Sequence, residues 1–276
     1  MGSFLLLLIV VIIYLLLVMP CLDRRKEISD YLNCFYAHRG MHDNNNGVPE
    51  NSLIAFEKAI LYGYGIELDV QLTKDDVAIV IHDDNLIRVC GINKKVSETT
   101  YDEISKLKLF NSNIGIPKLT DVLNLVEGKV PLIVELKTAD DIKNNCRIIA
   151  NILDGYLGRY CVESFNPFIM QWFRRHRPKV LRGQLSTNYF KEKVDQNFFN
   201  KFMLSYLLLN FISRPDFIAF NIKYKSMLSL KINKWLLNTP LFAWTVRSKE
   251  QLDEVKNFFD SFIFEQFIPK ETVNRK

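Results

Sequence analysis

Cysteine is scarce in this chain of 276 residues, and the five cysteines that occur are scattered. They stand at Cys21, Cys34, Cys90, Cys146 and Cys161, an odd number without paired spacings. A disulfide framework of the kind that stabilises small secreted domains is therefore excluded, and a reducing compartment is favoured.

Signatures of several other protein classes are also missing. The sequence has no glycine-rich phosphate loop and no Ser/His/Asp order of the kind found in hydrolases with a serine nucleophile. The net charge of +5 implies no nucleic-acid partner, and no motif implies a protein partner. This charge mildly favours contact with an anionic membrane surface.

One long apolar run is present at the amino terminus. Phe4–Met19 contains sixteen residues without a charge, about 24 Å of helix, slightly short of the roughly 20 residues that span a bilayer. A cleaved signal peptide would need a positively charged start and small residues before the cut, and both are missing. We therefore expect residues 1–22 to be an uncleaved membrane anchor, followed by a linker over 23–33. The basic run Arg24–Lys26 follows directly, so the positive-inside rule predicts a single-pass membrane protein with its main domain in the cytoplasm.

Polar motifs stand at the ends of apolar runs between residues 37 and 83. In order they are Ala37-His38-Arg39-Gly40, Pro49-Glu50-Asn51-Ser52, Glu67-Leu68-Asp69-Val70 and His82-Asp83. On a β-strand, Glu67 and Asp69 point to the same face. Carboxylates held so close disfavour their own ionisation unless a cation lies between them, and a divalent cation with oxygen ligands is the usual solution. The motifs therefore predict metal-assisted chemistry on a phosphate ester, with a solvated acidic strand edge as the alternative.

A short turn is expected to bring His82 to the two carboxylates. Only Lys74–Asp76 separates the run Ile66–Thr73 from the run that ends at His82, too few residues for a parallel crossover, so the two runs should form an antiparallel hairpin. If the turn is centred between Asp75 and Asp76, His82 lies opposite Asp69. Asp76 must then adopt a left-handed conformation, which aspartate tolerates.

The rest of the chain alternates between short strand-like runs and helical patterns. The eight strand candidates are Cys34–His38, Ile66–Val70, Leu132–Leu136, Tyr160–Ser164, Val180–Leu185, Phe217–Asn221, Leu241–Val246 and Phe262–Glu265. The helical patterns are Ser52–Tyr62, Thr120–Val126, Ile142–Leu153, Pro167–Arg175, Ser226–Leu237 and Lys249–Phe258. This alternation over about 240 residues fits a single (β/α)8 barrel, in which catalytic groups gather at the carboxyl ends of the strands.

Two segments depart from the repeat. Residues 85–117 are polar at first and then helical at Thr100–Leu107, and we interpret them as a small insertion beside the substrate entrance. Phe198–Ile212 is apolar on nearly every face, which predicts a well-buried barrel helix, with a lipid-docking element as the alternative.

The order of these motifs resembles that of the glycerophosphodiester phosphodiesterase family, from about Phe35 to about Phe267. The resemblance implies an α/β fold, a (β/α)8 TIM barrel over residues 34–276 with the insertion after the hairpin of the second strand. It also implies hydrolysis of glycerophosphodiesters to an alcohol and glycerol 3-phosphate with one divalent cation, Mg²⁺ or Ca²⁺.

The family's functional residues can be matched to this chain position by position. The acid/base histidines match His38 and His82, the phosphate-binding arginine matches Arg39, and the metal carboxylates match Glu67, Asp69 and Glu135. Lys137 stands two residues after the third carboxylate, as in the family, and Trp244 near a strand end is a candidate for the substrate pocket. The last strand departs from the family, because Phe264-Glu265-Gln266-Phe267 replaces the usual Thr-Asp-x-Pro.

The charges of this set suit a phosphodiester. Three carboxylates contribute about −3, whereas the cation, Arg39, Lys137 and one protonated histidine contribute about +5, which leaves roughly +2 for the substrate. We expect His38 to activate the nucleophile and His82 to protonate the leaving alkoxide. His42 is interpreted as a loop residue. The alternatives are a phospholipase D-like enzyme that acts on lysophospholipid or sphingolipid, and a non-catalytic membrane protein that binds lipid.

Overall fold

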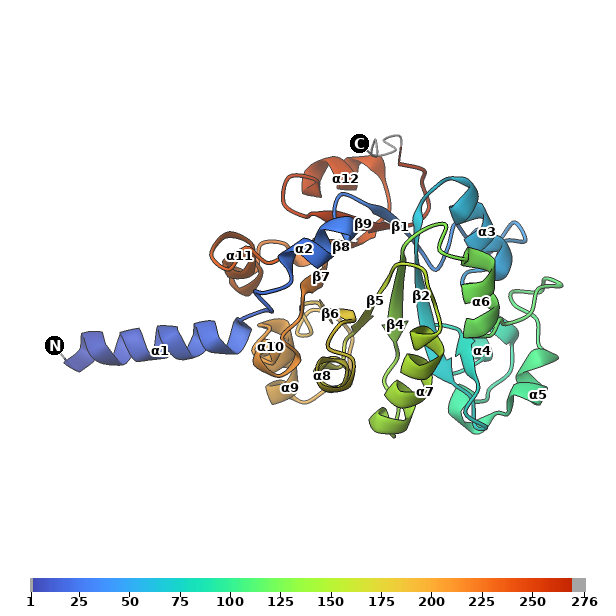
Figure 1. Ribbon diagram of the computed structural model, residues 1–276, viewed down its shortest axis with the longest axis horizontal. Helices are drawn as coiled ribbons and strands as arrows, with labels where there is room; N and C mark the ends of the chain where they lie inside the picture. Colours follow the sequence, from blue (N-terminus) through green and yellow to red (C-terminus); the bar gives the residue numbers. More distant parts are fainter. Residues whose placement is uncertain (1, 270–276) are drawn as a thin grey trace.

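Eight parallel strands close into a barrel in the computed structural model, which describes residues 2–269 (Figure 1). Strand β1 pairs with both β2 and β9, and this double pairing closes the sheet. The strands are β1 Phe35–His38, β2 Gly65–Leu72, β4 Leu132–Leu136, β5 Tyr160–Ser164, β6 Leu181–Ser186, β7 Phe217–Asn221, β8 Leu241–Val246 and β9 Ser261–Phe264. The eight predicted barrel strands are thus confirmed, each to within two residues.

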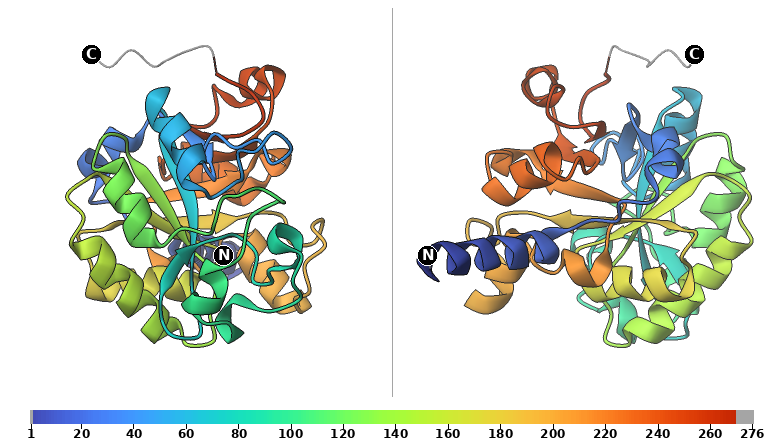
Figure 2. Two further views of the ribbon diagram at one scale, coloured as in Figure 1. Left: turned by 90° about the vertical axis from the view of Figure 1, so that its right-hand side faces the viewer. Right: turned by 60° about the vertical axis from the view of Figure 1, so that its left-hand side comes forward.

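Helices surround the barrel, as the views in Figure 2 show. The six predicted helices correspond to α3 Leu53–Leu61, α6 Leu119–Val126, α7 Ile142–Asp154, α8 Pro167–His176, α11 Leu228–Trp235 and α12 Lys249–Val255. Four of them begin at an Asn, Asp or Ser whose side-chain oxygen accepts a backbone N–H of the first turn. These capping residues explain why the starts of the four helices could be predicted from the sequence.

Two apolar layers hold the barrel together. Residues on the outer face of the strands pack against the surrounding helices, whereas Tyr36, Ile133, Phe217 and Phe242 fill the interior. Gly183 makes room for the ring of Phe217, since a Cβ at this position would lie 2.2 Å from ring atoms. The interior is therefore a packed core, and the polar groups lie above it at the carboxyl ends of the strands.

The segment expected as a linker packs against one end of the barrel. It contains α2 Arg25–Ile28 and a 3₁₀ turn Ser29–Tyr31. Ile28 and Tyr31 are buried in the interior cluster, and the Tyr31 hydroxyl donates to the carbonyl of Tyr160 at 2.9 Å. The domain boundaries at residues 22 and 33 stay a prediction, and residues 270–276 of the expected domain lie outside the described residues.

The predicted register of the hairpin is wrong by one residue. Strand β3 Ala78–Val80 runs antiparallel to β2 as expected, and Asp76 is left-handed with φ of 61°. However, Thr73 N–H donates to Val77 O, so the turn has three residues and is centred on Asp75. Asp69 therefore lies opposite Ile81, whose N–H donates to its carbonyl. His82 follows the end of β3 and still reaches the carboxylates.

The insertion over residues 85–117 has a small core of its own. It contains α4 Ile87–Cys90, a 3₁₀ turn Val96–Glu98 and α5 Tyr101–Ser105. Apolar side chains from these pieces pack with Ile79 and Ile81 of the β2–β3 arm. The insertion is therefore tied to the hairpin that precedes His82.

The expectation of a transmembrane helix is not supported. Helix α1 Gly2–Val18 has 17 residues, and no helix within residues 2–269 is both long and apolar enough to cross a membrane. The helix ends before Met19 because Pro20 disfavours a helical conformation in the residue before it. Its carboxyl end lies beside α10, where the Asn210 amide donates to the carbonyl of Val18 at 3.1 Å (Figure 1).

The apolar segment after β6 is not one buried helix. It forms α9 Phe198–Ser205 and α10 Asn210–Ser213. Phe198, Phe199 and Phe202 point outward, with exposed fractions of 75%, 67% and 41%, whereas Leu207 and Leu208 are buried. The expectation of a well-buried helix is therefore correct only for the turn between α9 and α10.

Candidate functional site

The three predicted metal carboxylates lie together at the carboxyl end of the barrel. Glu67 and Asp69 project from β2, and Glu135 projects from the adjacent strand β4, directly beside Asp69 in the register. All three side chains are buried, and one oxygen from each lies within 4.8 Å of the others. The sequence predicted this cluster correctly because the register of parallel barrel strands brings their inward positions to one level.

Two basic side chains balance these acids. The Lys137 Nζ lies 2.7 Å from both Asp69 Oδ1 and Glu135 Oε1, and the Arg39 Nε lies 3.3 Å from Asp69 Oδ2. Although burial opposes ionisation, Lys137 and Arg39 hold the pKa of Asp69 well below its usual value. Burial and the neighbouring acids Asp69 and Glu135 raise the pKa of Glu67 well above its usual value. Among residues 2–269, Asp69 therefore forms ion pairs with both Lys137 and Arg39, whereas Glu67 forms none with a lysine or arginine.

This arrangement fits a divalent cation. The ligand set consists of carboxylate oxygens from three buried side chains, which is the donor type that Mg²⁺ and Ca²⁺ prefer. Burial and the neighbouring carboxylates make the ionised form of Glu67 costly, which is why its pKa is raised. A cation bound beside Glu67 would stabilise the ionised form and so lower this cost. Glu67, Asp69 and Glu135 are thus the residues that could hold the ion.

A tight turn after β1 positions Arg39. Both Arg39 and Gly40 have positive φ, 56° and 79°. At Gly40 a Cβ would lie 2.8 Å from the backbone of Ala55, so glycine is required by conformation and by space. The turn points the Arg39 N–H at Glu67, 3.0 Å away, and the Arg39 Nη1 at Glu50, 2.7 Å away.

His38 is held by a carboxylate at its Nδ1 nitrogen. The distance from His38 Nδ1 to Glu265 Oε2 is 2.5 Å, and Glu265 also accepts a hydrogen bond from Arg247. Burial and the nearby Arg39 charge lower the pKa of His38 to about 4. His42, interpreted as a loop residue, lies 3.7 Å from the same carboxylate. Glu265 was not predicted as a site residue. Its position one residue after β9, where the family motif has an aspartate, could have identified it.

His82 lies across the same cavity. This cavity, about 180 Å³ in volume, is lined by His38, Arg39, Glu67, His82 and Glu135 together with Glu163, Phe165 and Trp244. The His82 Nδ1 lies 2.6 Å from Asp83 Oδ1, and the ring is about one-third exposed. Two histidines, each paired with a carboxylate, therefore face the predicted cation ligands from two sides.

The sequence pattern of the glycerophosphoryl diester phosphodiesterase family matches residues 38–260. The chain belongs to this family. A glycerophosphodiester phosphodiesterase from Caldanaerobacter subterraneus is 32% identical over 230 residues, which cover 79% of this chain and 88% of that protein. A glycerophosphodiester phosphodiesterase from Bacillus altitudinis is 39% identical over 114 residues, and the alignment spans only 45% of that relative.

A solved structure from Oleispira antarctica is similar over nearly the whole barrel. This phosphodiesterase, in complex with the product sn-glycerol-3-phosphate, is 18% identical, has a TM-score of 0.68, and is matched over 85% of this chain and 94% of that chain. At this identity the likeness shows the shared fold. The family, the barrel and the enzyme class expected from the sequence are confirmed, and these matches support glycerophosphodiester hydrolysis as the reaction.

In this family member Arg88 of the insertion forms hydrogen bonds to residues on both sides of the site. The Arg88 Nε donates to Asp83 Oδ2 at 2.5 Å, and its Nη groups donate to the two oxygens of Glu50 at 3.0 and 2.8 Å. Asp83 contacts His82, and Glu50 contacts Arg39. Arg88, which was not predicted from the sequence, therefore connects His82 on one side to Arg39 on the other.

Arg88→Met is expected to lower kcat by roughly tenfold to a hundredfold, because small displacements of catalytic groups have effects of this size. The loss should not require unfolding, since the Arg88 side chain is 41% exposed. Steady-state kinetics with a glycerophosphodiester would measure it, and Lys94→Met, on the same insertion, is the matched control. Equal kinetics in both variants would contradict a positioning role for Arg88.

A fourth carboxylate was also missed. Glu163 on β5 lies beside Glu135 in the register, is buried, and lines the same cavity. Burial and the charge of Glu135 raise its pKa well above the usual value. Trp244, the predicted pocket residue, lines the cavity from β8 and packs edge-to-face on Phe165 with ring centroids 5.5 Å apart.

Proposed function

We propose that this protein hydrolyses glycerophosphodiesters to an alcohol and glycerol 3-phosphate with one divalent cation held by Glu67, Asp69 and Glu135. The observation that carries the proposal is the meeting of these three buried carboxylates with His38 and His82 in one cavity. Family membership supports the reaction, and the oxygen ligands support Mg²⁺ or Ca²⁺ as the ion. When bound, the cation would supply positive charge to the phosphate oxygens as a Lewis acid.

The two histidines would divide the proton transfers between them. His38, oriented through its Nδ1 by Glu265, accepts at Nε2 a proton from the attacking water molecule, whose oxygen bonds to phosphorus. The new P–O bond forms as the P–O bond to the leaving alcohol breaks. His82, oriented by Asp83, donates the proton that the leaving oxygen needs. This assignment is supported by burial, because the His82 side chain is 35% exposed and the His38 side chain only 15%, so a leaving alcohol beside His82 has the shorter way to solvent.

Three further side chains would bind the substrate. Arg39 and Lys137 place positive charge at the edge of the carboxylate cluster, where a singly charged phosphodiester gains charge during the reaction. Trp244 presents an apolar wall to the organic part of the substrate. We further propose the cytoplasm as the compartment of this domain, supported by the odd number of scattered cysteines in the sequence.

Release of glycerol 3-phosphate from a panel of water-soluble glycerophosphodiesters tests the function. The full chain should turn over at least one member of the panel with Mg²⁺ or Ca²⁺, and a chelator should lower the rate by at least about a hundredfold. Activity should return when the ion is restored, which controls for irreversible unfolding. Turnover at an unchanged rate in the chelator would refute the cation site, and a folded protein that releases no glycerol 3-phosphate from any diester would refute the function.

A further inference from the structure

A second group of possible metal ligands lies at the other edge of the His38 ring. It consists of His38, His42 and Glu265, and one ligand atom from each lies within 4.8 Å of the others. The His38 Nδ1 contacts Glu265 Oε2 at 2.5 Å, and the His42 Nε2 lies 3.7 Å from that same oxygen. The His38 Nε2 instead faces Glu67, at 4.0 Å. The His38 ring therefore stands between this second cluster and the three carboxylates.

The imidazole of His42 is buried without a hydrogen-bond partner. Its side chain is 11% exposed, and neither shielded ring nitrogen forms a hydrogen bond within residues 2–269. An unpaired buried polar atom costs free energy, so a ligand that pairs with it is favoured. The backbone holds the ring in place, because the His42 N–H donates to Gly40 O at 2.9 Å and the next residue, Asp43, exchanges two backbone hydrogen bonds with Val48.

Glu265 turns one oxygen toward both histidines. Its Oε1 accepts a hydrogen bond from Arg247 Nε at 2.7 Å, whereas Oε2 lies nearest the two rings. Ligand atoms around a tetrahedral zinc ion are about 3.3 Å apart. The contacts of Oε2 with the two rings, 2.5 and 3.7 Å, lie on either side of this value. Small shifts of these side chains would therefore place three ligands around one ion.

The donor atoms of the two clusters differ in chemical type. Carboxylate oxygens alone suit Mg²⁺ and Ca²⁺, whereas two imidazole nitrogens with one carboxylate oxygen suit Zn²⁺ and related transition metals. Three protein ligands also leave a fourth tetrahedral position for a water molecule. The second cluster should therefore discriminate against the ions that the three carboxylates prefer.

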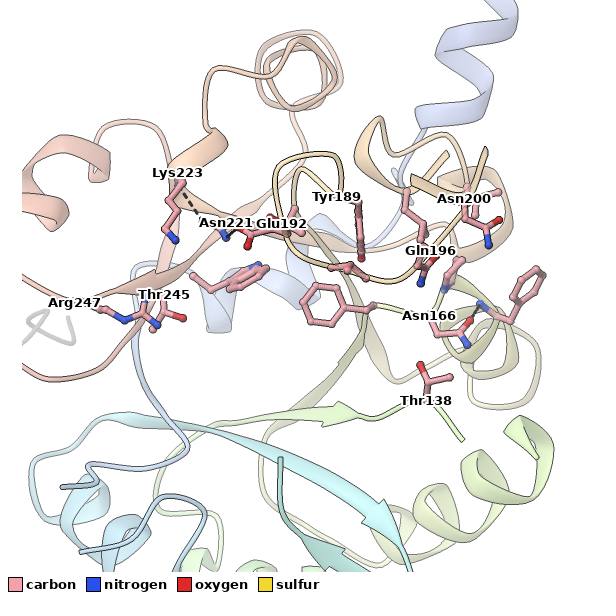
Figure 3. A pocket seen from close by; sticks show the side chains of 18 residues that line it. Thr138, Asn166, Tyr189, Glu192, Gln196, Asn200, Asn221, Lys223, Thr245 and Arg247 are labelled. Atoms are coloured by element: carbon pink, nitrogen blue, oxygen red, sulfur yellow. Dashed lines mark hydrogen bonds between the residues drawn. The ribbon is translucent and has the colours of Figure 1, made fainter. Parts of the chain in front are cut away.

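The second cluster lies in the wall between two cavities. His42 and Glu265 line an outer cavity of about 480 Å³, whereas His38 lines the cavity of the reaction centre. Within residues 2–269 these two cavities have no lining residue in common. The reaction centre continues instead into a third cavity, with Thr245 and Arg247 at one end (Figure 3). An ion can therefore reach the second cluster without passing through the space beside the three carboxylates.

We propose that His38 Nδ1, His42 Nε2 and Glu265 Oε2 form a second metal site, which takes Zn²⁺, and that zinc bound there inhibits the hydrolysis. The site goes beyond the function proposed above, and only the inhibition rests on the role of His38 in it. A neutral imidazole carries one N–H group. While Glu265 accepts the Nδ1–H, Nε2 can accept a proton. When zinc takes the Nδ1 lone pair, the ring proton moves to Nε2, and the ring no longer acts as a base.

Calorimetric titration with Zn²⁺ tests the site independently of activity. The full chain is titrated in excess Mg²⁺ and Ca²⁺, which keep the three carboxylates occupied. The wild-type protein should bind a single zinc ion, and His42→Ala and His42→Gln should each bind it at least about a hundredfold more weakly. The two variants differ in the volume that they remove, so one remains informative if the other fails to fold. His176→Ala, at an exposed histidine, is the matched control and should bind zinc as the wild type does.

Steady-state kinetics with a glycerophosphodiester tests the inhibition. Zinc at about ten times its Kd occupies about nine-tenths of the wild-type protein, so kcat should fall by about tenfold. A variant that binds a hundredfold more weakly is then only about one-tenth occupied and should lose less than about twofold of its own zinc-free rate. A chelator selective for zinc should restore the wild-type rate, whereas additional Mg²⁺ should not.

The outcomes separate the metal site from the proposed function. Equal zinc affinity in the wild type and the His42 variants would overturn the site. Inhibition that additional Mg²⁺ relieves would also overturn it, because the zinc would then occupy the three carboxylates. Turnover that bound zinc leaves unchanged would overturn the inhibition. A folded protein that binds zinc through His42 but hydrolyses no diester would refute the proposed function and leave the metal site intact.

Discussion

Glu67→Gln should reduce the turnover of glycerophosphodiesters by at least about a thousandfold and at the same time make the cation-free protein harder to unfold. Activity should fall because the amide removes one of the three carboxylates proposed to hold the cation. Stability rises because the carboxylate of Glu67 is buried beside Asp69 and Glu135, which makes its ionisation costly in the folded protein. The gain should be about 1–3 kcal/mol in the free energy of unfolding.

Kinetics and urea unfolding in a chelator would measure the two effects on the same samples. Glu57→Gln is the matched control, because Glu57 is exposed on α3 and should change neither quantity. With the cation present, the stabilising effect of the variant should shrink or reverse, since the wild-type protein then binds the ion more tightly. A variant that loses activity and also loses stability in the chelator would contradict the view that like charges strain this site.

The barrel and the cluster of three carboxylates were predictable because both depend on local sequence. The period of two places Glu67 and Asp69 on one face of β2, and the parallel register brings Glu135 level with Asp69. The alternation of strands and helices fixed the number of barrel strands, and helix caps such as Ser52 fixed several helix starts. The hairpin register was predicted wrongly because the sequence does not distinguish a two-residue turn from a three-residue turn, and the two turns shift the pairing by one residue. The hydrogen bond from Thr73 N–H to Val77 O shows that the turn has three residues.

The supporting groups of the site could not be predicted in the same way. Arg88 lies 38 positions from Glu50, and its contact depends on how the insertion folds over the hairpin. Glu265 lies 227 positions from His38, and their contact requires the closure of the barrel between β1 and β9. The sequence showed that Glu265 departs from the family pattern, but only the structure shows that its side chain contacts His38. A glutamate reaches the histidine from the end of β9 in place of the shorter aspartate.

His38→Ala should lower kcat by about a hundredfold to ten-thousandfold, the range expected when a general acid or base is removed. The reason is geometric, because Glu265 fixes the ring at Nδ1 and leaves Nε2 facing Glu67 at 4.0 Å, at the edge of the carboxylate cluster. KM should change much less than kcat, since His38 acts on the reacting atoms. Steady-state kinetics at saturating cation would separate these two constants. His176→Ala is the control, because His176 is exposed and its loss should change neither constant.

His42 is the second histidine to compare, because it contacts the same Glu265 carboxylate as His38. If His38 is the base, His42→Ala should cost less than about tenfold, and Glu265→Gln should produce a loss between those of the two histidine variants. The amide still contacts the His38 ring but no longer stabilises the imidazolium that forms when it accepts a proton. If His42→Ala instead equals His38→Ala, the two rings act as a unit on one proton. The pairing of His38 with Glu265 would then explain the orientation of the ring but not the choice of base.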